Sequence, residues 1–550
     1  MRGRYKIVPA SHLQECETMS GERVYLYDTT LRDGAQTHGV DFSAADKAAI
    51  ADVLDSIGID YIEGGWPGAN PRDDAFFQQE HNLNRSTLTA FGMTRRSGRS
   101  AANDPSLTAV LSANTPAVCL VGKTHDAHAL TALGVDLEEN LRMISESVSE
   151  CVGRGRETIF DAEHFFDGYK ANSSYALEAI ETALNAGARW VVLCDTNGGT
   201  LPNEISEIVS VVCARFPGEK IGIHTHNDTE NAVANSLAAV QAGARQVQGT
   251  LNGLGERCGN ANLISLIPSL MLKLGYDVGI SNEALKKLPE VSRILDERLN
   301  RAPNRHAAYV GASAFAHKAG LHVSAVEKDP SLYEHINPDI VGNSRLILVS
   351  DQAGRANVIS RFRDLGIDID AKDHRVLSIV EAVKEREYQG YSYDGAEASF
   401  ELLARRLTDG LPNYFSIETF RVLDEHRFEI GSQKPALSEA TVKVSVGSAR
   451  SLEVAEGNGP VNALDHALRK ALAPFYPVVN EVRLTDYRVR ILNSGDGTAA
   501  VTRVMLESSD ASGQRWTTVG LSGDIISASY EALTDGIIYK LMSSGALPPT

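Results

Sequence analysis

The chain lacks any pair of cysteines in C-x-x-C spacing, which excludes the simplest cysteine-based sites. Its six cysteines are scattered at positions 16, 119, 151, 194, 213 and 258. Isolated thiols argue against a disulfide scaffold or a zinc ribbon, and they favour a reducing compartment. We therefore expect Cys194 and Cys258, which fall inside polar motifs, to be small packing residues and not nucleophiles.

Long apolar runs and an excess of positive charge are also missing. No apolar stretch approaches the ~20 residues that a membrane-spanning helix needs. No apolar segment follows the weakly basic start MRGRYKIVPASHLQE, so we expect no secretory signal. The net charge of −18 argues against nonspecific binding to nucleic acid. We also find no G-x-G-x-x-G motif placed for a dinucleotide. The sequence therefore predicts a cytoplasmic protein that acts on small molecules.

Short apolar runs alternate regularly with amphipathic stretches from residue 24 to about residue 285. Eight of these runs are typical of buried strands, at 24–30, 59–65, 87–93, 117–123, 158–164, 190–196, 220–226 and 246–253. In the first connecting stretch, Ser43 is a candidate helix N-cap and Gly58 a helix stop. Eight strands alternating with helices over ~250 residues predict a (β/α)8 TIM barrel, with a doubly wound open sheet as the alternative.

The pattern changes after the barrel. Residues 286–430 are predicted to form mainly helical accessory subdomains, and the helical character extends from 283 to 425. Residues 431–550 are predicted to form a separate α+β domain. Its period-two strands are expected at 440–447, 485–492, 499–508 and 515–523. With an N-terminal extension at 1–22 and the barrel at 23–285, we expect four segments in all.

Polar residues are concentrated where the predicted strands end. The first strand runs into DTTLRDG, the sixth ends in DTNG, and the eighth leads into GTLNGLGERCGNAN. The seventh carries His224 and His226, which share one face because strand side chains alternate. Each motif alone is explained by turn chemistry. In a TIM barrel, however, reacting groups gather at the C-terminal ends of the strands. The two histidines therefore predict half of a metal site.

DTTLRDG, HTHND and GTLNGLGERCGNAN together resemble the pyruvate-carboxylate/isopropylmalate-synthase barrel family of metal-dependent carbon–carbon bond enzymes. HKAGLHV at 317–323 resembles the accessory segment of that family, and AEGNGPVNALDHAL at 455–468 resembles its C-terminal regulatory domain. The resemblance therefore covers nearly the whole chain. Within the family, RDGAQ and YIEGGWPGANP are most similar to the citramalate synthase branch. Ala35 and Trp66 stand where the isopropylmalate branch has Glu and Phe.

The resemblance implies a ligand set for one divalent cation. Asp33, His224 and His226 would bind it, with Asn260 as a fourth protein ligand. A mixed oxygen and nitrogen set without a thiolate suits Mn²⁺, Mg²⁺, Co²⁺ or Zn²⁺, so the residue types do not select the metal.

The resemblance also implies roles for residues around the ion. Arg32 would place positive charge beside the keto oxygen of a 2-oxoacid, with a salt bridge at the barrel rim as the alternative. Thr196 would bind the substrate carboxylate, or else cap the following turn. Glu163 would orient or relay the proton that a thioester methyl group must lose. Trp66 would narrow the oxoacid pocket, or else pack between barrel and helices.

Two further groups follow from the resemblance alone. His322 and Tyr333 are similar to an acid/base histidine and a tyrosine that reach over the barrel of the other subunit, which implies a homodimer. Gly253, Gly255 and Gly259 would let the backbone approach the coenzyme A arm closely.

The expected function is a metal-dependent Claisen condensation of acetyl-CoA with pyruvate. Thioester hydrolysis would then give citramalate and CoA for isoleucine biosynthesis, with isoleucine as feedback inhibitor. The alternatives are an isopropylmalate or homocitrate synthase, an acyl-CoA lyase on the same barrel, and a non-catalytic binding protein. The C-terminal regulatory-type domain argues against the lyase, and the intact ligand set argues against the binding protein.

Overall fold

The computed structural model describes residues 21–350, 353–366, 369–370, 373–408, 410–425, 428–429, 432–433, 437–492 and 500–549. It divides into two compact units. The first comprises the chain up to Phe315 together with Ile336–Ser344, and the second comprises Ala316–His335 and the chain from Arg345. Most of the expected N-terminal extension, 1–22, lies outside the described residues. Among the described helices, none has both the length and the apolar character needed to cross a bilayer.

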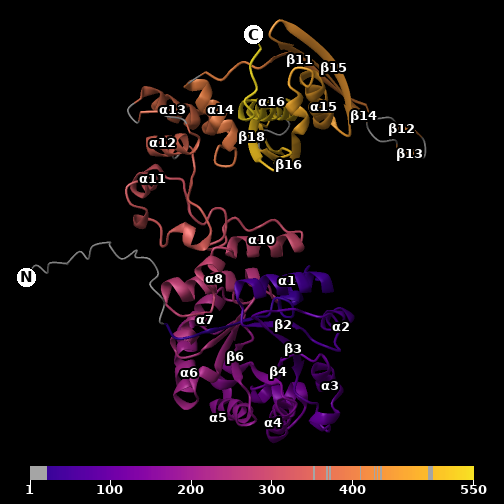
Figure 1. Ribbon diagram of the computed structural model, residues 1–550, viewed down its shortest axis with the longest axis vertical. Coiled ribbons are helices and arrows are strands. Elements are labelled where there is room, and N and C mark those ends of the chain that lie inside the picture. Colours follow the sequence, from indigo (N-terminus) through magenta and orange to yellow (C-terminus); the bar gives the residue numbers. More distant parts are fainter. Residues whose placement is uncertain are drawn as a thin grey trace, which may run out of the picture. The chain divides into compact units, whose positions relative to one another are not determined.

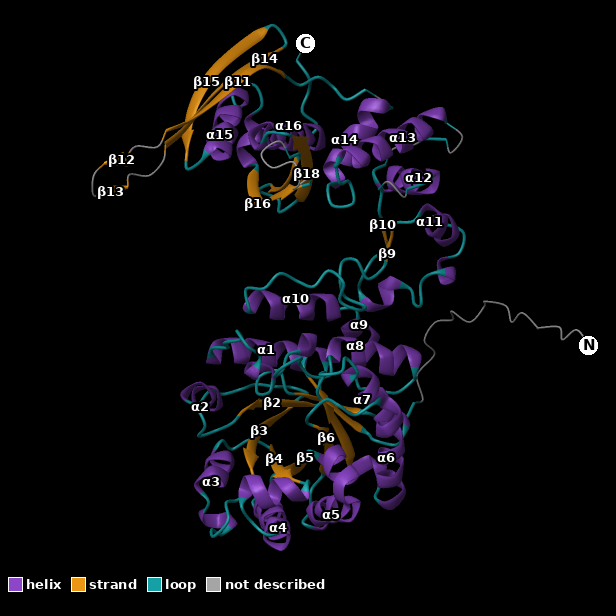
Figure 2. Cartoon of the chain, turned by 180° about the vertical axis from the view of Figure 1, so that it is seen from behind, coloured by secondary structure: helices purple, strands orange, loops and turns teal. Residues whose placement is uncertain are grey.

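The first unit is a closed parallel barrel surrounded by helices (Figures 1 and 2). Its strands are β1 (Tyr25–Asp28), β2 (Tyr61–Gly65), β3 (Thr87–Met93), β4 (Ala117–Lys123), β5 (Glu157–Glu163), β6 (Trp190–Asp195), β7 (Ile221–Thr225) and β8 (Gln246–Gly249). The ring closes where β1 pairs in parallel with β8, with Tyr25 opposite Gln246 and Asp28 opposite Gly249. An open sheet would leave these two strands as edges, so the TIM-barrel prediction is confirmed.

A helix follows each strand and covers the outside of the ring. These helices are α1 (Ala44–Ile57), α2 (Pro71–Phe77), α3 (Pro105–Ser112), α4 (Leu137–Gly153), α5 (Phe165–Asn185), α6 (Pro202–Arg215), α7 (Ala232–Gln241) and α8 (Leu263–Pro268), and α9 (Asn282–Leu285) and α10 (Leu288–Arg298) continue the unit. Helix α1 begins at Ser43, which forms a reciprocal capping box with Asp46. It ends at Gly58, whose φ of 97° suits glycine.

Alternate strand residues face opposite sides of the barrel wall. One set, including Leu26, Ile62 and Val191, packs into the large core under the helices. The other set points inward, where Tyr27, Trp190 and their neighbours form a separate aromatic cluster. The buried residues of the inward set that carry a carboxylate, an imidazole or an amide lie in β2, β5, β7 and β8: Glu63, Asp161, His224, Gln246 and Gln248. The barrel interior therefore carries charge and amide groups directly below the C-terminal rim.

The second unit combines helices with small sheets. Its helices are α11 (Gly320–Val326), α12 (Arg355–Asp364), α13 (His374–Gln389), α14 (Glu397–Leu407), α15 (Pro460–Leu472) and α16 (Ile525–Ser543). Its strands are β9 (Ala316–His317), β10 (Leu346–Ile347), β11 (Ser416–Glu425), β12 (Phe428–Glu429), β13 (Ser432–Gln433), β14 (Leu437–Val446), β15 (Ala449–Gly457), β16 (Arg483–Ile491), β17 (Thr502–Ser509) and β18 (Arg515–Ser522). Helix α15 packs on the β11–β14–β15 sheet (Figure 2).

One part of the predicted helical region is wrong. Residues 416–425 form strand β11, which pairs antiparallel with β14. The register shifts between Ile417 and Thr419, so the half-buried Ile417, Phe420 and Val422 do not alternate strictly. A bulge of this kind interrupts the period of two by which a strand is recognised in a sequence.

Candidate active site

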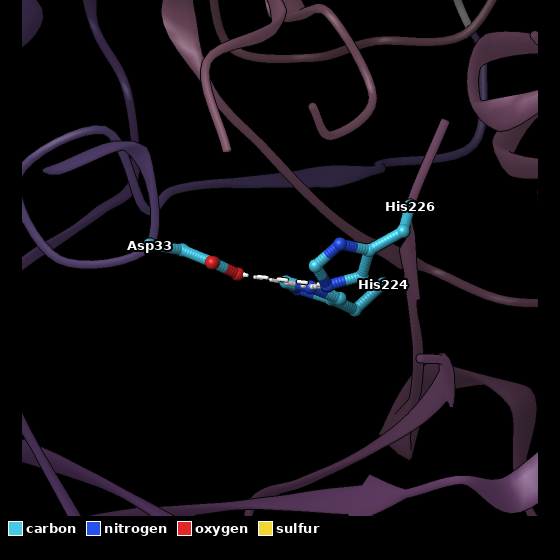
Figure 3. A group of neighbouring side chains, drawn as sticks. All are labelled: Asp33, His224 and His226. Atoms are coloured by element: carbon cyan, nitrogen blue, oxygen red, sulfur yellow. Dashed lines mark hydrogen bonds and ion pairs between the residues drawn. The ribbon is translucent and has the colours of Figure 1, made fainter. Parts of the chain in front are cut away.

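Three predicted metal ligands meet at the C-terminal end of the barrel (Figure 3). Asp33 lies in the turn after β1, His224 lies in β7, and His226 directly follows β7. Oδ2 of Asp33 is 3.3 Å from Nε2 of His224 and 3.8 Å from Nε2 of His226. The two Nε2 atoms are 3.2 Å apart. All three side chains are buried, and Figure 3 shows the carboxylate pointing at both rings.

The three ligands differ in how their surroundings shift their pKa values. Burial opposes ionisation of Asp33, but the Arg32 guanidinium and the contact with His224 hold its pKa well below the usual range. Burial and the neighbouring His224 lower the pKa of His226 to about 4. Burial alone would lower the pKa of His224, yet Asp33 outweighs it and raises that pKa. An anionic oxygen and two imidazole nitrogens converging on one point form a donor set that divalent metals bind.

Asn260 joins this group from the loop after β8. Its backbone forms a bridge with His226, and its Nδ2 lies 2.9 Å from Oδ2 of Asp33. Its Oδ1 is buried without a hydrogen-bond partner among the described residues. Turning the amide by half a rotation would place this oxygen toward the other ligands, and the two amide atoms are distinguished only by their contacts. The residue therefore fits the role of fourth ligand.

Arg32 lies between this group and a buried carboxylate. Its Nε donates to Glu63 at 2.6 Å, and Nη1 lies 3.5 Å from Asp33. Its guanidinium also stacks 3.9 Å from the ring centroid of Phe91. The Tyr27 hydroxyl donates to the other oxygen of Glu63 at 2.8 Å. The salt bridge considered as an alternative therefore exists, and it holds the cationic group beside the metal ligands.

Glu163 and Thr196 lie at neighbouring strand ends. Glu163 closes β5 and forms an ion pair with Lys123, its partner in the register with β4. The hydroxyl oxygen of Thr196 accepts the backbone N–H of His164 at 2.8 Å, which leaves the Thr196 hydroxyl proton outside that bond. His164 has a left-handed backbone with φ of 57°, a conformation uncommon for non-glycine residues. Strain of this kind is concentrated at functional sites.

Trp66 is fixed at the end of β2. Its backbone N–H donates to Asp73 at 2.8 Å, and its ring meets the Phe91 ring edge-on at 5.4 Å. Asp73 is ion-paired with Lys47, which also donates to the carbonyl of Gly64. A cavity of about 290 Å³ adjoins this corner, lined among others by Arg32, Gln36, Lys47, Trp66 and Arg72.

The loop after β8 uses its glycines for its own close packing. A Cβ atom at Gly255 would lie 2.0 Å from Oδ1 of Asn260, and one at Gly259 would lie 2.0 Å from the carbonyl of Gly253. Gly253 and Gly259 also have φ values of 71° and 94°. Contact with a coenzyme A arm stays a prediction for these residues.

His322 and Tyr333 belong to the second unit. Their rings pack against each other with centroids 4.4 Å apart and an interplanar angle of 31°. The structure thus brings the two together, and their action on a substrate stays a prediction.

Several residues of the site escaped the sequence interpretation. Arg257, from the loop after β8, pairs with Asp228 at 2.7 Å and donates to the Thr196 carbonyl at 2.7 Å. It therefore ties together the loops that follow β6, β7 and β8. Gln248, inside β8, lies with its Oε1 atom 2.8 Å from Nδ1 of His224. For Gln248, the signal available in the sequence was a polar residue at an inward position of a buried strand.

Comparisons with known proteins agree with this geometry. Residues 23–294 match the HMGL-like family model, 309–390 match the homocitrate synthase post-HMGL domain-like model, and 394–541 match the LeuA allosteric (dimerisation) domain. An (R)-citramalate synthase from Aquifex aeolicus is 53% identical over 95% of this chain and 98% of the relative. One from Geobacter sulfurreducens is 51% identical over the same shares.

More distant relatives include a protein with a different name. A probable 2-isopropylmalate synthase from Methanopyrus kandleri is 31% identical over 94% of this chain and 98% of the relative. A solved HMG-CoA lyase from Bacillus subtilis aligns with 51% of this chain and 95% of its own at 19% identity, with a TM-score of 0.45.

The fold and the site define an enzyme built on an HMGL-like TIM barrel. High identity over nearly the full length narrows the class, because five (R)-citramalate synthases match at 46–53%. The chain belongs to the (R)-citramalate synthase family, and the family predicted from its motifs is confirmed.

Proposed function

We propose that this enzyme condenses acetyl-CoA with pyruvate and hydrolyses the resulting thioester, giving (R)-citramalate and CoA. The observation that carries the proposal is the convergence of Asp33, His224 and His226 on one point at the barrel rim, in a chain about half identical to (R)-citramalate synthases. The reaction would serve isoleucine biosynthesis in the cytoplasm.

These three residues would hold one divalent cation, with Asn260 as the fourth protein ligand. Oδ1 of Asn260 is buried and has no hydrogen-bond partner in the described part of the chain, and the two histidine nitrogens lie 3.2 Å apart. Both observations support this assignment. When bound, the cation supplies Lewis-acid polarisation of the keto carbonyl of the oxoacid. Mn²⁺, Mg²⁺, Co²⁺ and Zn²⁺ all suit the donor set.

Arg32 would stabilise the negative charge that develops on the keto oxygen. Its pairing with Glu63 and its stacking on Phe91 fix the guanidinium before substrate arrives, so no reorganisation is needed as charge forms. Thr196 would donate its hydroxyl proton to the substrate carboxylate while its oxygen accepts from His164.

The acetyl methyl group must lose a proton to become a nucleophile. Glu163, held at the rim by Lys123, would orient or relay that proton. His322 and Tyr333 would complete the acid/base set from the other subunit of a homodimer. The matched dimerisation domain supports a dimer, and the contact between the two rings supports a joint role. Gly253, Gly255 and Gly259 would border the coenzyme A arm, and isoleucine would bind the C-terminal domain as feedback inhibitor.

The test is thiol release from acetyl-CoA with a panel of oxoacids: pyruvate, 2-oxoisovalerate and 2-oxoglutarate. We expect turnover with pyruvate, loss of turnover after exhaustive chelator dialysis, and recovery on adding Mn²⁺ or Mg²⁺. Asp33→Ala and His224→Ala should be inactive, because each removes a ligand. A higher kcat/KM with 2-oxoisovalerate would identify an isopropylmalate synthase instead. Full activity of verified metal-free wild type would refute the metal site.

A further inference from the structure

A hydrogen-bonded chain runs down into the barrel from the metal ligand His224. Nδ1 of His224 lies 2.8 Å from Oε1 of Gln248, and Nε2 of Gln248 lies 3.0 Å from Oδ1 of Asp161. The three residues come from β7, β8 and β5. Both Gln248 and Asp161 are buried, and Gln248 contacts His224 at Nδ1, the ring nitrogen away from the one that faces Asp33.

The hydrogen bonds between these three residues have a direction, because the carboxyl group at one end and the imidazole at the other differ in what they donate and accept. Nε2 of Gln248 donates to Oδ1 of Asp161, so this carboxyl oxygen holds the NH₂ group of the amide toward Asp161. The amide oxygen then faces His224 and requires a proton on Nδ1. A neutral imidazole protonated on Nδ1 carries its lone pair on Nε2. This is the nitrogen that faces Asp33 and His226.

We propose that Gln248 is a positioning residue that holds His224 in its Nδ1–H tautomer, and that Asp161 in turn fixes the orientation of the Gln248 amide. The proposal rests on the metal site of the proposed function and assigns it two further residues. Without the Asp161 carboxylate, the amide can turn and donate to Nδ1. The proton of the neutral ring then moves to Nε2 and blocks the nitrogen that binds the ion.

Other contacts hold this His224–Gln248–Asp161 relay in place. Sγ of Cys119, in β4, lies within 4.8 Å of a carboxylate oxygen of Asp161. The backbone of Gln248 is held in the barrel ladder opposite Tyr27 of β1. The three side chains of the relay therefore have little freedom to form another hydrogen-bond pattern unless one of them is changed.

A matched control lies two residues away on the same strand. Gln246 is also buried and inward-facing, but neither atom of its amide has a hydrogen-bond partner among the described residues. Gln246→Leu therefore makes the same chemical change in the same strand without touching the relay. The pair Gln248→Leu and Gln246→Leu separates loss of the relay from loss of a buried amide.

Exchanging the carboxylate and the amide between positions 161 and 248 tests the direction of the hydrogen bonds and not only the packing of the side chains. In the double variant Asp161→Asn with Gln248→Glu, the amide and the carboxylate exchange places. The carboxylate at 248 accepts from the amide at 161 and from Nδ1–H of His224, so the tautomer is preserved. Gln248→Glu alone places two carboxylates side by side, and Asp161→Asn alone allows either amide orientation.

The experiment measures the Kd for Mn²⁺ of the metal-depleted full chain, from the electron paramagnetic resonance signal of free Mn²⁺, without substrate. We expect Gln248→Leu to raise Kd about 10- to 100-fold, as loss of a ligand-orienting partner typically does. Gln246→Leu should stay within about twofold of wild type. The swap should bind Mn²⁺ more tightly than either of its single variants.

Equal Kd values for Gln248→Leu and Gln246→Leu would overturn the proposal. So would a swap variant no tighter than Gln248→Glu and Asp161→Asn, a comparison that decides the matter even if Gln248→Leu does not fold. Wild type that binds Mn²⁺ but releases no thiol with pyruvate contradicts the proposed reaction and leaves this comparison intact. Wild type that binds no Mn²⁺ contradicts the metal site and the relay together.

Discussion

Asp28, at the end of β1, gives a prediction that needs neither metal nor substrate. Its side chain is fully buried and accepts the backbone N–H and the hydroxyl of Thr30 at 2.8 and 2.7 Å. Burial outweighs these bonds and raises the pKa of Asp28 to about 7. In the unfolded chain the same carboxyl has a pKa of about 3.9. Between these values the folded state holds a proton that the unfolded state has released.

The sign of the effect follows from this difference. Where the native state binds more protons, the free energy of unfolding falls as pH rises. The contribution is fully present below about pH 4 and is lost as pH rises to about 7. A difference of about three pKa units corresponds to about 4 kcal/mol, of which about 2–3 kcal/mol falls between pH 5 and pH 8. Asp28→Asn has no carboxyl to ionise and should lack this loss.

The measurement is urea unfolding of wild type and Asp28→Asn at pH 5 and pH 8. A Trp516→Phe background leaves Trp66 and Trp190, both in the barrel, as fluorescence probes. The stability of Asp28→Asn relative to its parent should increase by about 2–3 kcal/mol from pH 5 to pH 8.

Asp104→Asn is the matched control, because Asp104 is buried but caps α3 with its pKa lowered by backbone hydrogen bonds that outweigh its burial. Its carboxyl is ionised at both pH values, so its relative stability should not change between them. A constant difference for Asp28→Asn as well would show that Asp28 is ionised inside the fold, and would refute the reasoning.

Three further predictions concern selectivity, regulation and stability. The kcat/KM for pyruvate should exceed that for 2-oxoisovalerate by at least about 100-fold, since exclusion of a larger acid by a clash can be strong. Trp66→Ala should reduce that ratio. An unchanged ratio in an active variant would assign the selectivity to other pocket residues. Isoleucine should inhibit the full chain more than leucine does. A chain ending near residue 430 should lose this inhibition, because coupling of the effector site to the active site needs the C-terminal domain. Equal inhibition of the shortened chain would place the effector site elsewhere. Gln246→Leu should raise the free energy of unfolding in urea by about 1–3 kcal/mol, because it removes a buried amide that has no partner among the residues that the structure describes. A destabilised variant would show that the amide is hydrogen-bonded in solution.

The barrel could be predicted from the sequence because its strands are short apolar runs with clear stops. Gly58 and the capping box at Ser43 mark the ends of the first helix with local chemistry alone. Strand β11 could not be found in this way. Its bulge disturbs the period of two, and the pairing with β14 that stabilises it comes from residues further along the chain. Tertiary partners of this kind leave little trace in a local window.

The ligand group was predicted from spacing and family motifs, since His224 and His226 share a strand face and Asp33 follows another strand. The residues that support this ligand group were not predicted from the sequence. Glu63 approaches Arg32 from 31 positions away, and Gln248 contacts Asp161 from 87 positions away. No motif spacing relates such residues. Arg32 and Glu63 meet because β1 pairs with β2, whereas Asp161 and Gln248 meet because the closed barrel brings β5 and β8 to opposite sides of one interior.

One general signal was nevertheless available. In a barrel strand buried on both faces, a polar residue in the inward phase must find a partner across the interior, because an unpaired buried polar group is costly. Glu63, Asp161, His224 and Gln248 share that inward phase, and each has a partner. Glu63 contacts Arg32 and Tyr27. Gln248 contacts both Asp161 and His224, and His224 also contacts Asp33. Gln246 shares the phase and has no partner among the described residues. Inward polarity therefore identifies candidates for the site, and only the structure separates a relay from an isolated amide.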